Sequence, residues 1–169
     1  ATMTYAFLYV FMTLGAFAFL AWMGRPPSPV YPHGRDAEDF ADLAGLAKRK
    51  PWAAALMSVF MISLAGIPPT SGFLGKFLLF KAALEAGQPL LAIIGILASI
   101  LSLAYYLRVI VTMYMHESEA RPDAAAEPAV ASDFNIGLVV LLAAVLTLYF
   151  GIVPGDYLNV VEKAISQLR

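Results

Sequence analysis

Residues 63–80 read SLAGIPPTSGFLGKFLLF, an apolar run that contains a helix breaker and one lysine, Lys76. The breaker consists of Gly66, Pro68, Pro69, Ser71 and Gly72. Proline removes a backbone hydrogen-bond donor and disfavours a helical conformation in the residue before it. One helix is therefore expected to end at the breaker, and the hydroxyls of Thr70 and Ser71 can cap a second helix.

Composition indicates that this breaker lies in a membrane protein. Of the 169 residues, 60% are hydrophobic and only 14% are charged, with a mean hydropathy of +0.75, which is unlike a soluble domain. Four stretches carry no charge and could each cross a hydrocarbon core of roughly 30 Å as a helix: residues 1–24, 51–75, 86–107 and 134–155. The sequence predicts an all-α, polytopic transmembrane helical bundle.

The expected bundle is a single membrane domain, residues 1–169, with about four crossings. The expected spans are residues 3–22, 52–66 together with 72–86, 89–115 and 134–153. Segments 52–66 and 72–86 are each short for a full crossing, so we interpret them as two halves of one broken helix. The alternative is two complete short spans joined by a tight turn, and the positive-inside rule does not decide between the two arrangements. The uncharged linker favours the broken helix.

A shorter helix is expected outside the hydrocarbon core. Residues 36–50 begin with acidic residues and end with basic ones, which complements the helix dipole, and their apolar residues share one face. We interpret them as an amphipathic helix at the membrane interface. With about four crossings, most basic residues fall on one side, which the positive-inside rule assigns to the cytoplasm: Arg25, Arg35, Lys48, Arg49, Lys50, Arg108 and Arg121.

Charge and cysteine content exclude several classes of function. The net charge is −1 and no long basic run is present, so nucleic acid is not an expected partner. The chain has no cysteine, which excludes disulfides and thiolate metal sites.

Lys76 is the leading candidate for a functional residue. A charged side chain at the centre of a membrane helix costs roughly 2.5 to 3.5 kcal/mol on insertion scales, and no acid in the apolar spans is available to pair with it. Transporters use broken helices around ionisable groups, because freed backbone groups and a cavity can hold ions and water. Lys76 is therefore a candidate proton relay; alternatively it snorkels or forms a static ion pair.

A second candidate feature lies on the expected helix 89–115. Ser99, Ser102 and Tyr106 follow Gly95 at helical spacing and give that helix one small, polar face. Close helix packing through small residues is one interpretation. The functional interpretation is that these hydroxyls hold water beside Lys76.

Four stretches together resemble a known family. The run LAGIPPTSGFLGKF, residues 64–77, is similar to the second broken helix of the antiporter-like membrane subunits of respiratory complex I, Mrp antiporters and membrane-bound hydrogenases. DLAGLAKRKP (42–51), YYLRVIVTMYMHE (105–117) and YVFMTLGAFAF (9–19) resemble the subunit N family of bacterial proton-pumping NADH:quinone oxidoreductase. That family more often has asparagine where Thr13 stands.

The resemblance implies a role for Lys76 and a setting for the chain. Lys76 matches the lysine of the second broken helix, on the proton route toward the periplasmic side. The chain would be the C-terminal part of a longer subunit in the bacterial inner membrane, with the other pathway residues N-terminal to Ala1. Its partners would be the lipid bilayer and other membrane subunits of complex I, including a neighbouring antiporter-like subunit.

The resemblance also implies that this chain is a non-redox subunit of a translocase and holds no cofactor or metal. NADH, FMN, iron-sulfur clusters and quinone would belong to other subunits. Two alternatives stay open: a subunit of an Mrp-type cation/proton antiporter or membrane-bound hydrogenase, and a structural piece without transport activity of its own.

Overall fold

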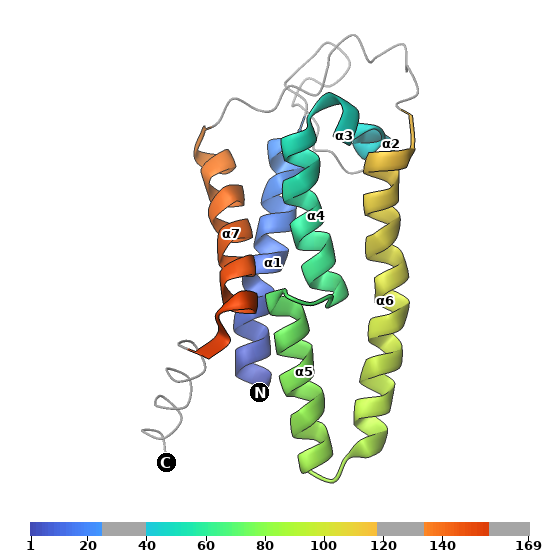
Figure 1. The fold of residues 1–169 in the computed structure, drawn as a ribbon, viewed down its shortest axis with the longest axis vertical. Helices are drawn as coiled ribbons and strands as arrows, with labels where there is room; N and C mark the ends of the chain where they lie inside the picture. Colours follow the sequence, from blue (N-terminus) through green and yellow to red (C-terminus); the bar gives the residue numbers. More distant parts are fainter. Residues whose placement is uncertain (25–39, 118–133, 156–169) are drawn as a thin grey trace.

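The computed structural model describes residues 1–24, 40–117 and 134–155 as a bundle of helices without a strand among them. Its long helices are α1 (Thr2–Trp22), α4 (Pro51–Ala65), α5 (Ser71–Glu85), α6 (Pro89–Met115) and α7 (Phe134–Ile152). Two short helices, α2 (Phe40–Leu43) and α3 (Leu46–Arg49), lie at one end of the bundle (Figure 1). The predicted all-α fold class is confirmed.

Proline and glycine mark the helix ends. Pro51 and Pro89 occupy the first turns of α4 and α6, where a missing N–H costs nothing. Gly66 ends α4 with φ 83°, and Gly87 follows α5 with φ 69°, both in the left-handed region that favours glycine. Helices α1, α6 and α7 are long and apolar enough to cross a membrane, whereas α4 is a shorter apolar helix.

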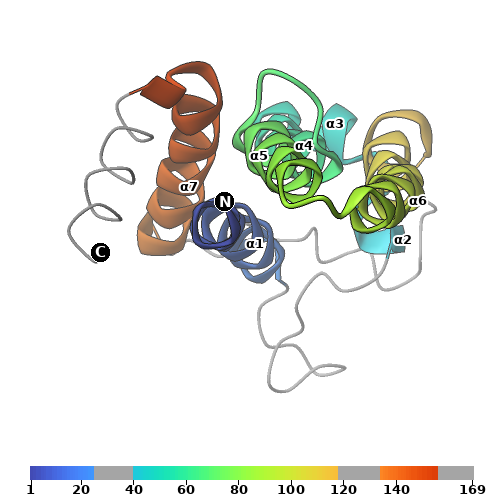
Figure 2. The same ribbon diagram turned by 90° about the horizontal axis from the view of Figure 1, so that it is seen from below.

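Helices α4 and α5 lie one beyond the other along the long axis of the bundle. Figure 1 shows that together they run alongside the length of α6, and in Figure 2, viewed along that axis, they overlap. At 1.5 Å per residue, each 15-residue helix is about 22 Å long and the 27-residue α6 about 40 Å. Helix α1 packs against both α4 and α5 and also against α7.

The segment before α4 differs from the single amphipathic helix expected for residues 36–50. Among its described residues, α2 and α3 are separate, because Gly45 adopts φ 67°, which no right-handed helix can continue. The N–H of Gly45 donates to the carbonyl of Thr112 on α6 at 3.3 Å. Leu43 and Leu46 are buried in the core, so the segment packs onto the end of the bundle. Residues 36–39 lie outside the described residues.

Basic residues gather at this end of the molecule. Lys48, Arg49 and Lys50 stand where α3 meets α4, close to the end of α6 (Figure 1). The ammonium of Lys48 pairs with Glu117 at 3.1 Å, and the guanidinium of Arg108 lies 5.1 Å from the centre of the Phe40 ring. Of the basic residues predicted for the cytoplasmic side, Arg25, Arg35 and Arg121 lie outside the described residues.

Candidate functional site

At the C-terminus of α4, the carbonyls of Leu64 and Ala65 accept no backbone N–H from the described residues that follow the helix. The two carbonyls before them do. Gly66 N–H donates to the carbonyls of Ile62 and Ser63, at 3.1 and 2.9 Å, and Ile67 N–H donates to Ile62 at 3.1 Å. This pattern is a Schellman motif, which needs the left-handed glycine and satisfies those two acceptors. The carbonyls of Leu64 and Ala65 remain free to accept from another donor.

Lys76 supplies that donor. Its Nζ donates to the carbonyl of Leu64 at 2.9 Å and to that of Ala65 at 3.3 Å. The side chain therefore reaches from the second turn of α5 back to the end of α4, where the negative end of the helix dipole favours a cation. Both acceptors are backbone carbonyls rather than carboxylates.

The N-terminus of α5 is capped from α4. Thr70 occupies the N-cap position with an extended backbone, but its hydroxyl donates backward to the carbonyl of Ile67 at 2.7 Å. The side chains of the two expected caps, Thr70 and Ser71, therefore do not cap α5, and Ser71 is itself the first residue of the helix. Instead the hydroxyl of Ser63 accepts the N–H of Gly72 at 3.1 Å, and Ser71 lies 3.4 Å from the same hydroxyl. Helices α4 and α5 thus cap each other at the break.

Glycines allow the backbones to meet at the break. A Cβ on Gly72 would collide with the carbonyl oxygen of Ser63, and a Cβ on Gly66 would stand 3.0 Å from Cδ of Lys76. From the other side, Gly151 on α7 packs against the backbone from Pro69 to Ser71, and a Cβ there would collide with it. The linker is therefore enclosed by protein on the α7 side, although the rings of Pro68 and Pro69 are exposed.

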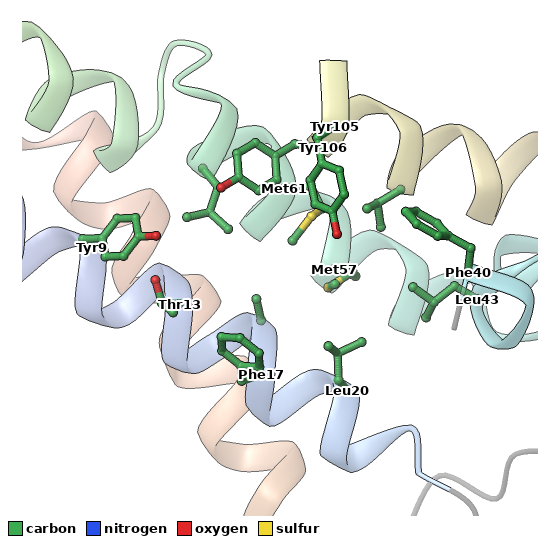
Figure 3. A pocket seen from close by; sticks show the side chains of 13 residues that line it. Tyr9, Thr13, Phe17, Leu20, Phe40, Leu43, Met57, Met61, Tyr105 and Tyr106 are labelled. Atoms are coloured by element: carbon green, nitrogen blue, oxygen red, sulfur yellow. The ribbon is translucent and has the colours of Figure 1, made fainter. Parts of the chain in front are cut away.

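A cavity of about 280 Å³ lies between α1, α2, α4 and α6, and Leu64 is its lining residue nearest in sequence to the break. Figure 3 shows Tyr9 and Thr13 of α1 on one side and Tyr105 and Tyr106 of α6 on the other. Leu64, whose carbonyl holds Lys76, also lines the cavity. The hydroxyl of Thr13 is buried and finds no hydrogen-bond partner among the described residues.

The structure separates the three residues predicted to hold water. Tyr106 lines the cavity, but Ser99 and Ser102 do not belong to its lining. Ser102 donates its hydroxyl to the carbonyl of Ala98 at 2.9 Å, within its own helix. Gly95, at the start of the same face, faces the ring of Phe80, where a Cβ would stand 2.7 Å from a ring carbon. This face thus packs closely on α5 at Gly95 and reaches the cavity at Tyr106.

Sequence reasoning missed Ser63 as a site residue. Its position just before the breaker was the only available signal, since a serine near a helix end is often a cap. The lining of the cavity also includes Tyr9 and Thr13 of α1. Lys81, by contrast, pairs with Glu85 at 3.7 Å on the exposed face of α5, as its i, i+4 spacing suggests.

The chemistry available at this site is that of a lysine, hydroxyls and backbone groups. Within residues 1–24, 40–117 and 134–155, no three His, Asp or Glu side chains gather in a way that could hold a metal ion. The arrangement can hold a cation at the C-terminal end of a helix. Among these groups, the lysine amine and the hydroxyls are the ones that can exchange protons.

Comparison with protein families and curated proteins identifies relatives. Residues 1–102 match the family described as "NADH:quinone oxidoreductase/Mrp antiporter, TM". NADH-quinone oxidoreductase subunit N of Trichlorobacter lovleyi is 42% identical over 166 residues, covering 96% of this chain and 31% of that protein. Subunit N 1 of Herpetosiphon aurantiacus is 39% identical over 161 residues, covering 95% and 30%.

A solved structure gives the same indication. Respiratory complex I from Thermus thermophilus with bound aureothin contains a chain that matches with a TM-score of 0.68 and 28% identity, over 90% of this chain and 32% of that one. The present chain thus spans about a third of the length of the relatives that it matches. The predicted resemblance is confirmed: this multi-pass chain of the bacterial inner membrane belongs to the NADH:quinone oxidoreductase/Mrp antiporter transmembrane family.

Proposed function

We propose that this chain is part of a membrane subunit of respiratory complex I and takes part in proton translocation coupled to NADH:quinone electron transfer. Lys76 is the proton relay. The chain acts as a non-redox part of the translocase, and NADH, FMN, iron-sulfur clusters and quinone bind to other subunits. Its partners are lipid and the other membrane subunits, among them a neighbouring antiporter-like subunit.

The geometry of Lys76 carries this proposal. Its amine donates to two carbonyl oxygens at a helix break, and no carboxylate among the described residues pairs with it. Carbonyl dipoles stabilise an ammonium, yet a neutral amine can still donate to one of them, so either protonation state can be accommodated. A carboxylate partner would instead fix the charge by a direct ion pair.

The neighbouring cavity supports the same role. Leu64, whose carbonyl accepts from Lys76, is also one of the residues that line the cavity. The hydroxyls of Tyr9, Thr13 and Tyr106 are polar groups that water in the cavity needs as partners. The buried hydroxyl of Thr13, which has no partner among the described residues, fits a bound water.

Replacing Lys76 by arginine in the full-length subunit tests the relay. Arginine keeps the positive charge and the donors to the helix end, but it does not release its proton in proteins. We expect Lys76→Arg to lower proton pumping by at least about tenfold, because the relay step then fails. Pumping is measured in inverted membrane vesicles, together with quinone reductase activity and the amount of assembled complex.

Lys81→Arg is the matched control, because Lys81 lies on the same helix and pairs with Glu85 at the surface. It should leave pumping unchanged. Normal pumping by an assembled Lys76→Arg complex would show that Lys76 serves as a fixed charge or cap, as in the purely structural alternative. The Mrp-type antiporter and hydrogenase alternatives are not favoured by the relatives, whose names are those of complex I subunits.

A further inference from the structure

Ser63 joins three helices through one hydroxyl group. That hydroxyl lies 2.8 Å from Sδ of Met12 on α1, 3.1 Å from the N–H of Gly72 and 3.4 Å from the hydroxyl of Ser71. Ser63 is fully buried, at 0% exposure. A hydroxyl has one hydrogen and two lone pairs, so donation to Met12 and acceptance from Gly72 and Ser71 use its whole capacity.

The position of Ser63 in the sequence ties it to the partners of Lys76. Ser63 directly precedes Leu64 and Ala65, whose carbonyls hold the amine. Gly72 and Lys76 are four residues apart and share one face of α5. The hydrogen bond from Gly72 to Ser63 and the hydrogen bonds from Lys76 to Leu64 and Ala65 therefore both join the end of α4 to the start of α5. They lie about one helical turn apart on α5.

The close fit at Gly72 leaves little room for water to replace the Ser63 hydroxyl as acceptor of the Gly72 N–H. Gly72 is buried, and the space above its Cα is filled by the carbonyl of Ser63. Without the Ser63 hydroxyl, the N–H of Gly72 would lose its partner in a place with little room for water. The first turn of α5 could then shift relative to the end of α4, and the amine of Lys76 would lose its fixed distance from the two carbonyls.

We propose that Ser63 is a positioning residue for Lys76: its hydroxyl fixes α5 against α4, so that the amine meets the carbonyls of Leu64 and Ala65. This inference rests on the proposed relay function of Lys76. Ser63 acts through the helix break rather than on the proton itself, because its hydrogen-bond partners are Met12, Ser71 and Gly72.

The test replaces Ser63 by alanine in the full-length subunit within the complex. We expect Ser63→Ala to lower the rate of proton pumping by about 5- to 10-fold, because the loss of one buried hydrogen bond shifts the population away from the correctly placed arrangement by about that factor. Ser63→Thr keeps the hydroxyl and should restore pumping. The control is Ser58→Ala, because Ser58 also lies on α4 with 9% exposure but donates to the carbonyl of Ala54 in its own helix.

A second measurement reports on the position of Lys76 independently of pumping. The purified complex is treated with an amine-acylating reagent, and modification is followed by mass spectrometry. Ser63→Ala should speed acylation of Lys76 several-fold, while the exposed Lys81 serves as the internal reference. Ser58→Ala should leave both rates unchanged.

The two measurements separate failure of this inference from failure of the relay. If Lys76→Arg pumps normally, the relay is wrong, yet faster acylation of Lys76 in Ser63→Ala still supports the positioning role. If acylation is the same with and without the Ser63 hydroxyl, the positioning role is overturned whatever Lys76→Arg does. It is also overturned if pumping falls only in proportion to the amount of assembled complex, or if Ser63→Thr fails to restore it.

Discussion

Gly72 and Gly137 are both helical glycines, but their surroundings differ. A Cβ on Gly72 would collide with the backbone carbonyl of Ser63, which cannot rotate away as a side chain can. A Cβ on Gly137 would stand 3.4 Å from the ring of Trp22, an ordinary contact. The close approach of two backbones therefore requires glycine at position 72. Position 137 has room for a Cβ.

We predict that Gly72→Ala destabilises the folded subunit by about 2–3 kcal/mol, as overpacking does where the neighbour is rigid. Gly137→Ala should be neutral or stabilise by about 0.5–1 kcal/mol, because alanine favours the helix. Thermal unfolding of the full-length subunit in detergent measures both variants. Equal melting temperatures for the two would contradict the packing described at the break.

At the scale of elements, α2 and α3 cover the end of the bundle where α4 begins. Leu46 opens α3 and is fully buried, at 0% exposure, in the core to which α1, α4, α6 and α7 contribute. Gly45 anchors the turn to α6 through the carbonyl of Thr112. Arg49 reinforces it by donating to the carbonyl of Ala44 at 2.9 Å. These contacts make the segment part of the packed bundle.

Truncation of Leu46 tests that packing. We expect Leu46→Ala to lower the stability of the subunit by about 2–4 kcal/mol, from lost burial and the cavity left behind. The same change at Lys48, whose side chain is 67% exposed, should alter stability by less than about 0.5 kcal/mol. Unfolding in detergent is again the measurement. A loss at Leu46 no larger than at Lys48 would indicate that the segment lies loosely on a surface.

At the scale of the whole molecule, the most exposed helix is α6. The buried residues of α6 are Ala92, Val109, Thr112 and Met113, so most of its apolar side chains point away from the bundle. Leu101 near its middle and Met115 at its end are both 78% exposed. Because the two side chains are equally exposed, the two positions differ mainly in their expected depth in the membrane.

Arginine at these two positions tests the depth of α6. Leu101→Arg should impair membrane insertion, since a charge at the helix centre costs roughly 2.5 to 3.5 kcal/mol. Met115→Arg should have a much smaller effect, because an arginine at the helix end can reach the interface. The fraction of subunit integrated into the membrane measures the difference. Similar integration of both would mean that Leu101 does not lie near the centre of the bilayer.

Local features of the sequence determined the helices of this protein. Hydropathy and uncharged length indicated the apolar helices, and Pro51, Gly66 and Pro89 marked their ends, because proline and glycine act on the backbone of their own and adjacent residues. The position of Lys76 after the breaker identified it as the candidate relay. The single helix predicted for residues 36–50 is interrupted at residues 44–45, where Gly45 adopts a left-handed conformation and donates its N–H to Thr112 of α6.

Only the tertiary structure decided what satisfies the groups at the break. The acceptors of Lys76 are backbone carbonyls, which every residue carries, so no residue type marks Leu64 and Ala65 as its partners. Ser63 caps α5 from nine residues away, and the local candidate Thr70 does not. The sequence determined where the helices break; because unpaired backbone groups bond to whatever donor or acceptor packing brings near, the fold determined how the break is closed.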